Sequence, residues 1–206
     1  MSSEKIEGTA RERLLKAADE LFYKEGVHTV GIDRVIERAG VAKASLYSTF
    51  GSKEELVIAY LKQRAERRQR RVRERIARHE EPRARIIAVF EFVCELVMEP
   101  DFRGCAFANA SAEGPREESR VNQVCIDSRA WTRMLLVDLA RETGAKNPDQ
   151  LGRQLALLYD GAIVAASADR DPSAAREALA AAELLLDTQV PVTPKKRAGR
   201  AQAPAS

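Results

Sequence analysis

The chain has 206 residues, of which 45% are hydrophobic and 32% charged, and its formal net charge is +3. No run approaches the ~20 apolar residues of a membrane span, the N-terminal residues do not form a signal peptide, and three widely spaced cysteines do not predict a disulfide framework. These features exclude membrane-spanning and disulfide-rich classes, so we expect a cytoplasmic protein with no membrane partner.

Composition indicates the fold class, and the distribution of charge indicates the type of partner. Proline and glycine are scarce, while alanine, leucine, arginine and glutamate are abundant, which predicts an all-α fold. Residues 1–78 hold 18 Lys and Arg against 12 Asp and Glu, whereas the rest of the chain holds 16 against 19. A basic front and a mildly acidic remainder indicate a nucleic-acid-binding part joined to something else.

Four helices are predicted in the first 80 residues. Apolar residues at helical spacing predict a first helix over about residues 9–25, a short second one over residues 32–39 and a third over about residues 42–49. Glycines follow the first two helices, where a C-terminal cap belongs. Ser52 then caps a long fourth helix, with Glu55 as its expected partner in a capping box.

The fourth helix should continue over about residues 53–80. Its second half is heavily charged with a thin apolar line, so we interpret it as a solvated linking helix and not as a second DNA-binding surface. Further helices are predicted over residues 85–98, from Pro115 to about Gly144, from Pro148, and from Pro172 to about Val190, with a short segment at residues 102–114. Residues 191–206 lack apolar periodicity, which predicts a disordered basic tail.

Three short helices joined by tight glycine turns form a helix-turn-helix pattern. On the third helix, Ala42, Leu46 and Phe50 fall at i, i+4 and i+8 and predict an inward stripe. The outward side then carries Lys43, Ala44, Ser45, Tyr47 and Ser48. Small side chains let a helix approach a major groove closely, and hydroxyls bond base edges or phosphates. From spacing alone, an ordinary packed helical hairpin is the alternative.

Residues 10–60 resemble the DNA-binding domain of TetR-family (tetracycline-repressor type) transcriptional regulators. The resemblance is carried by LLKAADELFYKEG, by AGVAKASLY and by FGSKEEL. It implies a transcriptional regulator that binds a double-stranded DNA operator, with residues 1–52 as the DNA-binding domain. By position, the implied DNA-binding residues are Thr29, Gly31, Lys43, Ala44, Ser45, Tyr47, Ser48 and Lys53, of which Tyr47 and Lys53 hold phosphates.

The sequence departs from the family pattern at two points. Val30 and Gly31 stand where many members begin the second helix with a hydroxyl residue, and Thr29 is the nearest substitute. Ser48 stands where many members have a bulky aromatic residue or histidine. The base preference of other members therefore does not carry over.

The resemblance also implies that residues 53–190 bind a small-molecule effector and form a homodimer through the last two helices. Small and leucine side chains favour close helix packing, and the expected dimer residues are Leu155, Leu158, Ala162, Ala165, Ala178 and Leu185. An intrachain core is the alternative. A dimer would place two recognition helices about 34–36 Å apart, which suits a palindromic operator.

The helices between these regions should enclose an effector cavity, whose occupation releases a repressor from its operator. The candidate lining residues are Phe90, Cys94, Met98, Cys105, Phe107, Asn109, Trp131, Met134 and Tyr159. Plain core packing is the alternative for the aromatic and methionine residues. Asn109 and Glu113 are expected to hydrogen-bond the effector.

Cys105 suggests another mode of control. It resembles a cysteine at a similar place in electrophile-responsive members, and Arg103 supplies a nearby positive charge, so a thiol-based redox or electrophile sensor is the alternative function. A small buried filler residue is the simpler interpretation. The sequence contains no nucleophile–base pair, phosphate loop or metal-ligand spacing, so we predict no enzyme activity, no cofactor and no metal site.

Overall fold

The computed structural model describes residues 7–113 and 119–191, and within them the chain forms nine helices and no strand. This confirms the all-α fold class. The predicted basic tail lies outside the described residues, apart from Pro191.

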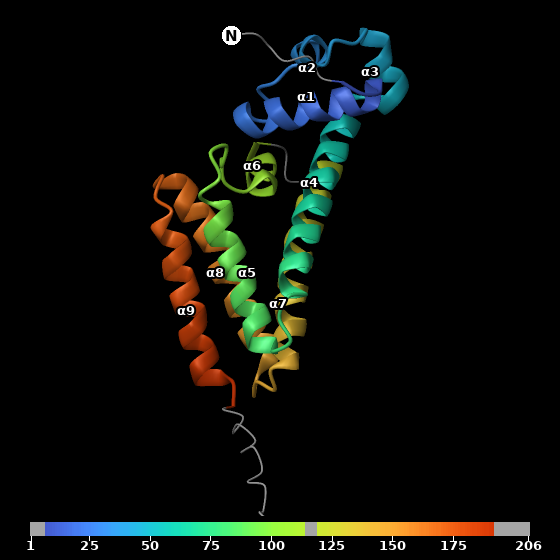
Figure 1. The fold of residues 1–206 in the computed structure, drawn as a ribbon. Helices are drawn as coiled ribbons and strands as arrows, with labels where there is room; N and C mark the ends of the chain where they lie inside the picture. The colour runs from blue at the N-terminus through green and yellow to red at the C-terminus, as the bar shows by residue number, and fades with distance from the viewer. Residues whose placement is uncertain (1–6, 114–118, 192–206) are drawn as a thin grey trace, which may run out of the picture.

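Figure 1 shows a head of short helices at one end of a bundle of longer ones. The head contains α1 (Ala10–Glu25), α2 (Ile32–Ala39) and α3 (Lys43–Phe50). The long helix α4 (Lys53–Ile76) runs from the head into the bundle, which also contains α5 (Pro82–Leu96), α7 (Arg120–Glu142), α8 (Pro148–Ala168) and α9 (Ser173–Gln189). The short helix α6 (Ala106–Glu113) lies between head and bundle.

The helix boundaries follow local capping. Ser52 caps α4 as predicted, because its Oγ accepts from the N–H of Glu55 at 3.1 Å. The capping box is only half formed, since the Glu55 carboxylate pairs with Arg120 of α7 instead. A complete box occurs at the start of α1, between Thr9 and Glu12, where we did not predict one.

Three predicted helices have different boundaries. Helix α5 runs over Pro82–Leu96 and not over residues 85–98, because Pro82 fits the first turn of a helix. Helix α7 begins at Arg120 and not at Pro115, because Ser119 is its N-cap and accepts from the N–H of Asn122 at 3.3 Å. Helix α4 ends at Ile76, a turn before residue 80. Helix α6, in the segment left without an assignment, is rich in alanine, which favours helix strongly.

The described residues form two hydrophobic cores. One fills the bundle around Phe90, Leu136 and Leu155. The other fills the head around Leu14 and Leu46, together with the upper part of α4, and it includes Phe107 and Ala110 of α6. Helix α6 therefore packs with the head, although in the sequence it lies between α5 and α7 of the bundle.

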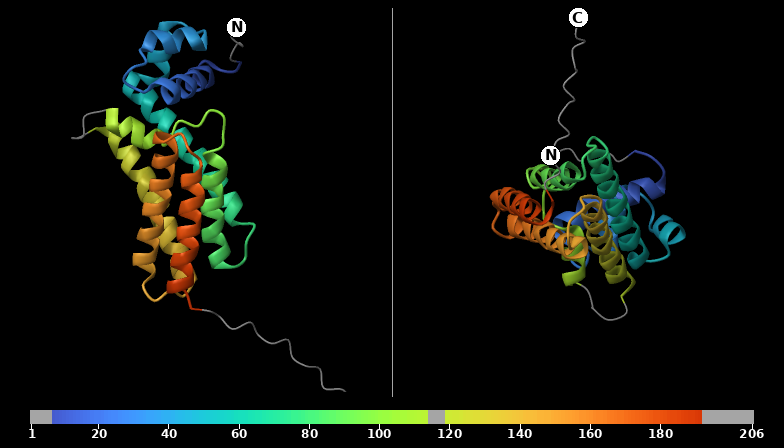
Figure 2. Two further views of the ribbon diagram at one scale, coloured as in Figure 1. Left: turned by 90° about the vertical axis from the view of Figure 1, so that its left-hand side faces the viewer. Right: turned by 90° about the horizontal axis from the view of Figure 1, so that it is seen from below.

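Helices α7 and α8 approach each other closely. A Cβ added to Gly152 would lie 2.4 Å from the Cα of Val137, so only glycine permits this approach. Helices α8 and α9 lie side by side at the front of the bundle in the left view of Figure 2. Within residues 7–113 and 119–191, no helix has the length and apolar character needed to cross a membrane.

Candidate functional site

Helix α3 is held on the head by few side chains. Leu46 is fully buried, and Val41 and Phe50 pack half-buried against the same core. The predicted inward stripe is wrong at Ala42, which is exposed. Ala42 is the N-cap and has an extended backbone, so it lies outside the helical wheel and Val41 fills the inward position.

The outward side of α3 is polar and low in relief. We call its exposed residues the recognition face: Lys43, Ala44, Tyr47 and Ser48. Ser45 is half-buried, and its carbonyl accepts from the hydroxyls of Ser48 at 3.2 Å and Thr49 at 2.6 Å. Each hydroxyl oxygen keeps lone pairs with which to accept a further hydrogen bond.

Lys43 is the cation of the recognition face. Its Nζ lies 3.0 Å from Asp33 of α2, and this hydrogen bond to the carboxylate raises the pKa of Lys43. Both side chains are more than half exposed, and exposed pairs of this kind are weak. A phosphate group can therefore replace Asp33 at little cost.

The other predicted DNA-binding residues lie at helix starts. Thr29 and Gly31 are exposed before α2, whose N-cap Gly31 provides no side-chain hydrogen bond. Lys53, the first residue of α4, is half-buried. Burial lowers its pKa, and the Glu113 carboxylate of α6 acts in the opposite direction. Contact between these residues and DNA remains a prediction.

Polar contacts hold α2 and the turn after it against α1. Arg34 binds Glu25 with both Nη atoms, at 2.6 and 3.0 Å. The guanidinium of Arg13 donates to the carbonyl of Gly40 at 3.2 Å. These contacts, together with the small core, fix the position of the recognition face on the head.

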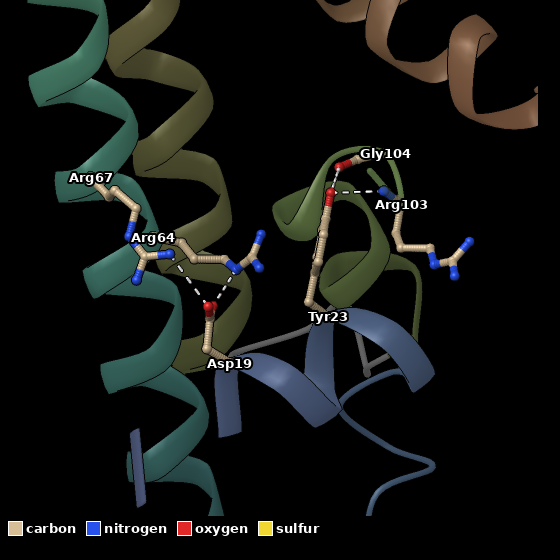
Figure 3. A network of polar contacts seen from close by, with 6 residues as sticks. All are labelled: Asp19, Tyr23, Arg64, Arg67, Arg103 and Gly104. Atoms are coloured by element: carbon tan, nitrogen blue, oxygen red, sulfur yellow. Dashed lines mark hydrogen bonds and ion pairs between the residues drawn. The ribbon is translucent and has the colours of Figure 1, made fainter. Parts of the chain in front are cut away.

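Helix α6 is bound near one end to α1 and near the other to the turn after α1. The Tyr23 hydroxyl accepts from the N–H of Arg103 at 2.9 Å and donates to the carbonyl of Gly104 at 3.0 Å (Figure 3). Burial raises the pKa of Tyr23, so the hydroxyl keeps the proton that it donates. At the other end, Glu113 accepts from the N–H of His28 at 2.9 Å.

The Glu113 contact depends on Gly26. This residue has φ +98°, and a Cβ on it would lie 2.8 Å from both carboxylate oxygens of Glu113. Glycine adopts this φ without strain and leaves room for the carboxylate. The turn after α1 is therefore shaped to receive the end of α6.

Helix α1 is also bound to α4. Asp19 accepts from Arg64 at 2.5 Å and from Arg67 at 3.4 Å (Figure 3). The guanidinium of Arg64 also stacks on the Tyr23 ring, 3.5 Å from its centroid. Tyr23 thus contacts α4 and the loop before α6 at the same time.

Two cavities adjoin α6. The first, of about 530 Å³, lies among α6, α7 and α8, and we call it the α6–α8 cavity; its lining residues are Cys105, Phe107, Ala108, Ser111, Ala112, Asn122, Cys125, Ile126, Arg129, Asp160, Ile163 and Val164. The second, of about 300 Å³, we call the arginine cavity; its lining residues are Asp19, Tyr23, Arg64, Arg67, Arg68, Arg71, Phe92, Leu96, Glu99, Asp101, Gly104, Cys105, Ala106, Phe107 and Ile163. The volume of the α6–α8 cavity lies within the range of small-molecule sites, and that of the arginine cavity lies at its lower limit.

Of the predicted effector-contacting residues, Cys105 and Phe107 line both cavities. The other seven line neither. Phe90 and Tyr159 are buried in the bundle core, Cys94 and Trp131 pack half-buried against it, and Met98 and Met134 are exposed. Asn109 is exposed as well, and its side-chain amide donates to the carbonyl of Arg103 at 3.0 Å.

The polar lining of both cavities was not predicted from the sequence. In the α6–α8 cavity, Arg129 binds Asp160 at 2.7 and 3.0 Å. In the arginine cavity, four arginines come from the charged half of α4, which we interpreted as a solvated linker. Arg64, Arg68 and Arg71 recur at spacings of four and three residues, and this periodicity was the available signal.

Burial makes two of the three thiols poor nucleophiles. It raises the pKa of Cys125 to about 11 and raises that of Cys94 as well. A thiol with a raised pKa stays protonated at neutral pH, and only the thiolate is reactive. The redox alternative therefore depends on Cys105 alone. In the described part of the chain, no group of three His, Cys, Asp or Glu residues is arranged to hold a metal ion.

The outer sides of α8 and α9 carry exposed apolar residues among charged ones such as Arg153, Glu177 and Glu183. We call four of the apolar positions the apolar α8–α9 face: Leu157, Gly161, Val164 and Leu184. Leu157 is 68% exposed and Leu184 66%. The predicted dimer residues lie deeper, since Leu155, Ala162 and Ala178 are buried within the chain and Leu158, Ala165 and Leu185 are half-buried. On α8 the exposed stripe is displaced by one residue toward the N-terminus from the predicted one.

Comparison with known proteins identifies similar chains. Residues 14–60 match the family model described as bacterial regulatory proteins, tetR family. The chain is 34% identical to SCO4454, a TetR-family transcriptional regulator from Streptomyces coelicolor, with a TM-score of 0.83 over 87% of this chain and 89% of that one. For a putative TetR transcriptional regulator from Streptomyces avermitilis, the identity is 33% and the TM-score 0.76, over 88% and 98% of the two chains.

A curated relative matches over a shorter length. The transcriptional activator FasR of Mycolicibacterium smegmatis is 32% identical over 136 residues, which are 65% of this chain. The matched part spans 60% of FasR.

Proposed function

Because this chain belongs to the TetR family of DNA-binding transcriptional regulators, we propose that it is a homodimeric repressor released from a palindromic operator by a small-molecule effector. In this proposal residues 1–52 bind DNA, and residues 53–190 bind the effector and form the dimer. The recognition face enters the major groove, where Ala44 permits close approach and Lys43 and Ser48 reach base edges. Tyr47 and Lys53 hold phosphates.

The dimer forms through the apolar α8–α9 face. Gly161 and Val164 allow a helix of the partner to approach, and Leu157 and Leu184 supply the buried area. Exposed apolar residues on neighbouring helices are typical of such an interface. A two-fold axis between the two copies would place the recognition faces on successive turns of one side of the DNA.

The observation that best supports an effector response is the position of α6. This helix forms a wall of both cavities and is bound to the head at both of its ends. A ligand that moves α6 pulls on α1 through Tyr23 and Glu113. The head then rotates relative to the bundle, and the separation of the two recognition faces changes. The effector must bind the released form more tightly than the DNA-bound form.

The test is selection of bound duplexes from a random DNA pool by the full chain. We expect an inverted repeat with half-sites one helical turn apart, or a multiple of it. Tyr47→Ala should weaken binding to the selected DNA, and Tyr47→Phe, which removes only the hydroxyl, serves as the matched variant. A pool that yields no repeat, or an unchanged affinity for Tyr47→Ala, overturns the proposal.

Repression needs a test of its own, since the relative FasR is named an activator. A reporter gene placed downstream of the selected DNA shows whether the protein represses or activates transcription. Expression that falls when the protein is present and returns with the effector supports repression. Expression that rises with the protein rejects it.

A further inference from the structure

Arg68 differs from the other arginines of the arginine cavity. Arg64 and Arg67 bind Asp19, and Arg71 binds Glu99. Arg68 has no carboxylate partner among the described residues. Its Nη2 donates to the carbonyl and the hydroxyl of Ser128 on α7, at 3.0 and 2.8 Å. Its Nε is buried and has no hydrogen-bond partner in the described part of the chain.

The cavity lining carries an excess of positive charge. Its four arginines face three carboxylates, those of Asp19, Glu99 and Asp101. Asp101 is exposed to solvent, while Asp19 and Glu99 are already bound to other arginines. A half-buried guanidinium without a counter-charge is unfavourable, and it is a ready site for an anion.

An apolar surface lies directly beside Arg68. Its guanidinium stacks on Phe107, 4.8 Å from the ring centroid, and Phe107 and Ile163 line both cavities. An anionic group bound at Arg68 thus has the mostly apolar α6–α8 cavity next to it. We infer that the effector is an amphipathic carboxylate whose anionic group binds Arg68 and whose apolar part packs on Phe107.

This assignment rests on the proposed function and gives it a chemical class of ligand. It also places the anion close to the contacts between α6 and the head, because Tyr23 and Gly104 line the same cavity as Arg68. An anion that draws Arg68 away from Ser128 acts on α7 and on Phe107 of α6 together. Helix α6 is thereby displaced at the point where Tyr23 holds it.

The probes are octanoate and decanoate, with decanol as the uncharged control of equal chain length. Binding to the full chain is measured by titration calorimetry and by the fluorescence of Trp131, the only tryptophan in the sequence. Its ring centroid lies 6.0 Å from the Arg68 guanidinium carbon. Decanoate should bind at least about tenfold more tightly than decanol, as expected for a charged hydrogen-bonded contact.

Arg68→Gln should abolish this preference, and Arg68→Lys, which keeps the charge but not the fork, should retain part of it. The matched control is Arg73→Gln. The guanidinium carbon of Arg73 also lies over the Trp131 ring, 5.4 Å from its centroid, but Arg73 lines neither cavity. If Arg68→Gln does not fold, the comparison of wild type with Arg68→Lys still tests the assignment.

Equal binding of decanoate and decanol to the wild type overturns the assignment. So does an Arg68→Gln variant that keeps the preference for decanoate, or an Arg73→Gln variant that loses it. Absence of binding by both carboxylates overturns it as well. Binding to the selected DNA is measured on the same preparation. If that DNA is bound and a neutral compound releases it, only the Arg68 assignment fails; if no DNA is bound, the proposed function fails.

Discussion

Two exposed faces of this molecule differ in chemistry. The recognition face of α3 combines a lysine, an alanine, a tyrosine and a serine, whereas the apolar α8–α9 face combines leucines with a glycine and a valine. A polar, low-relief helix next to a basic charge suits a groove with phosphates along its edges. An apolar stripe on long neighbouring helices suits a second helix pair of the same kind.

The two faces also differ in how they are supported. Leu46 is the only fully buried side chain of α3, and the turn before this helix is held to α1 by the hydrogen bond from Arg13 to the carbonyl of Gly40. Helices α8 and α9 instead contribute a full row of buried residues to the bundle core. We therefore expect α8 and α9 to act as a rigid base and α3, which has fewer buried side chains, to be held less firmly.

The largest expected effect comes from charging the apolar face. The double substitution Leu157→Arg and Leu184→Arg should give a monomer, because it places four cations in an interface of two copies. Operator affinity should then fall at least about 100-fold, since the second half-site no longer binds at a high effective concentration. Light scattering after size exclusion and fluorescence anisotropy with operator DNA measure the two effects.

Met98→Arg is the control for that experiment, because Met98 is 64% exposed and lies outside α8 and α9. It should leave both the mass and the affinity unchanged. A double variant that remains a dimer would place the interface elsewhere and remove the distinction between the two faces.

The next largest effect should come from Ala44→Glu on the recognition face. The carboxylate adds bulk where the helix must come close to the groove, and it repels phosphates. We expect operator affinity to fall about 10- to 100-fold, equivalent to about 1.4–2.8 kcal/mol. The measurement is anisotropy at one fixed salt concentration, because affinity for DNA varies steeply with salt.

The same substitution at Ala77, which is exposed at the far end of α4, controls for the added charge. Ala77→Glu should bind the operator like the wild type. If Ala44→Glu also does so, α3 is not the helix that enters the groove.

The recognition face was largely predictable from sequence, and the apolar face was not. In α3, Leu46 and Phe50 are the only large apolar residues besides Tyr47, so the inward side has few alternatives. Two residues were misplaced, because Ala42 is the exposed N-cap and Ser45 is half-buried and not outward. In α8, apolar residues occupy nearly every position from Leu155 to Ala166. Periodicity then does not decide which side is outward, and only packing against α7 and α9 does.

The contacts of α6 were beyond the reach of sequence analysis for a different reason. Glu113 and His28 are 85 residues apart, and Tyr23 and Gly104 are 81 apart. Nothing in the spacing of a single sequence pairs such residues. Glu113 was singled out as a polar residue toward the effector, but the structure directs its carboxylate to the head.

The substitution with the smallest expected effect tests whether α6 connects the recognition face to the bundle that carries the apolar α8–α9 face. Glu113→Gln keeps the size of the side chain but removes the charge that accepts from the His28 N–H, a bond worth about 1 kcal/mol. Amide hydrogen exchange in the turn at residues 26–30 should become about fivefold faster. Operator affinity without effector should change by a similar or smaller factor, and the dimer mass should not change.

Glu142→Gln is the matched control, since Glu142 binds Arg85 at 2.7 Å at the end of α7 and is exposed in the same way. It should leave exchange in that turn as it is in the wild type. If Glu113→Gln also leaves it unchanged, the head is not held through the end of α6, and the effector response must pass through Asp19 and α4 instead. A faster exchange together with a weakened effector response would instead identify Glu113 as the link between the rigid base and the recognition face.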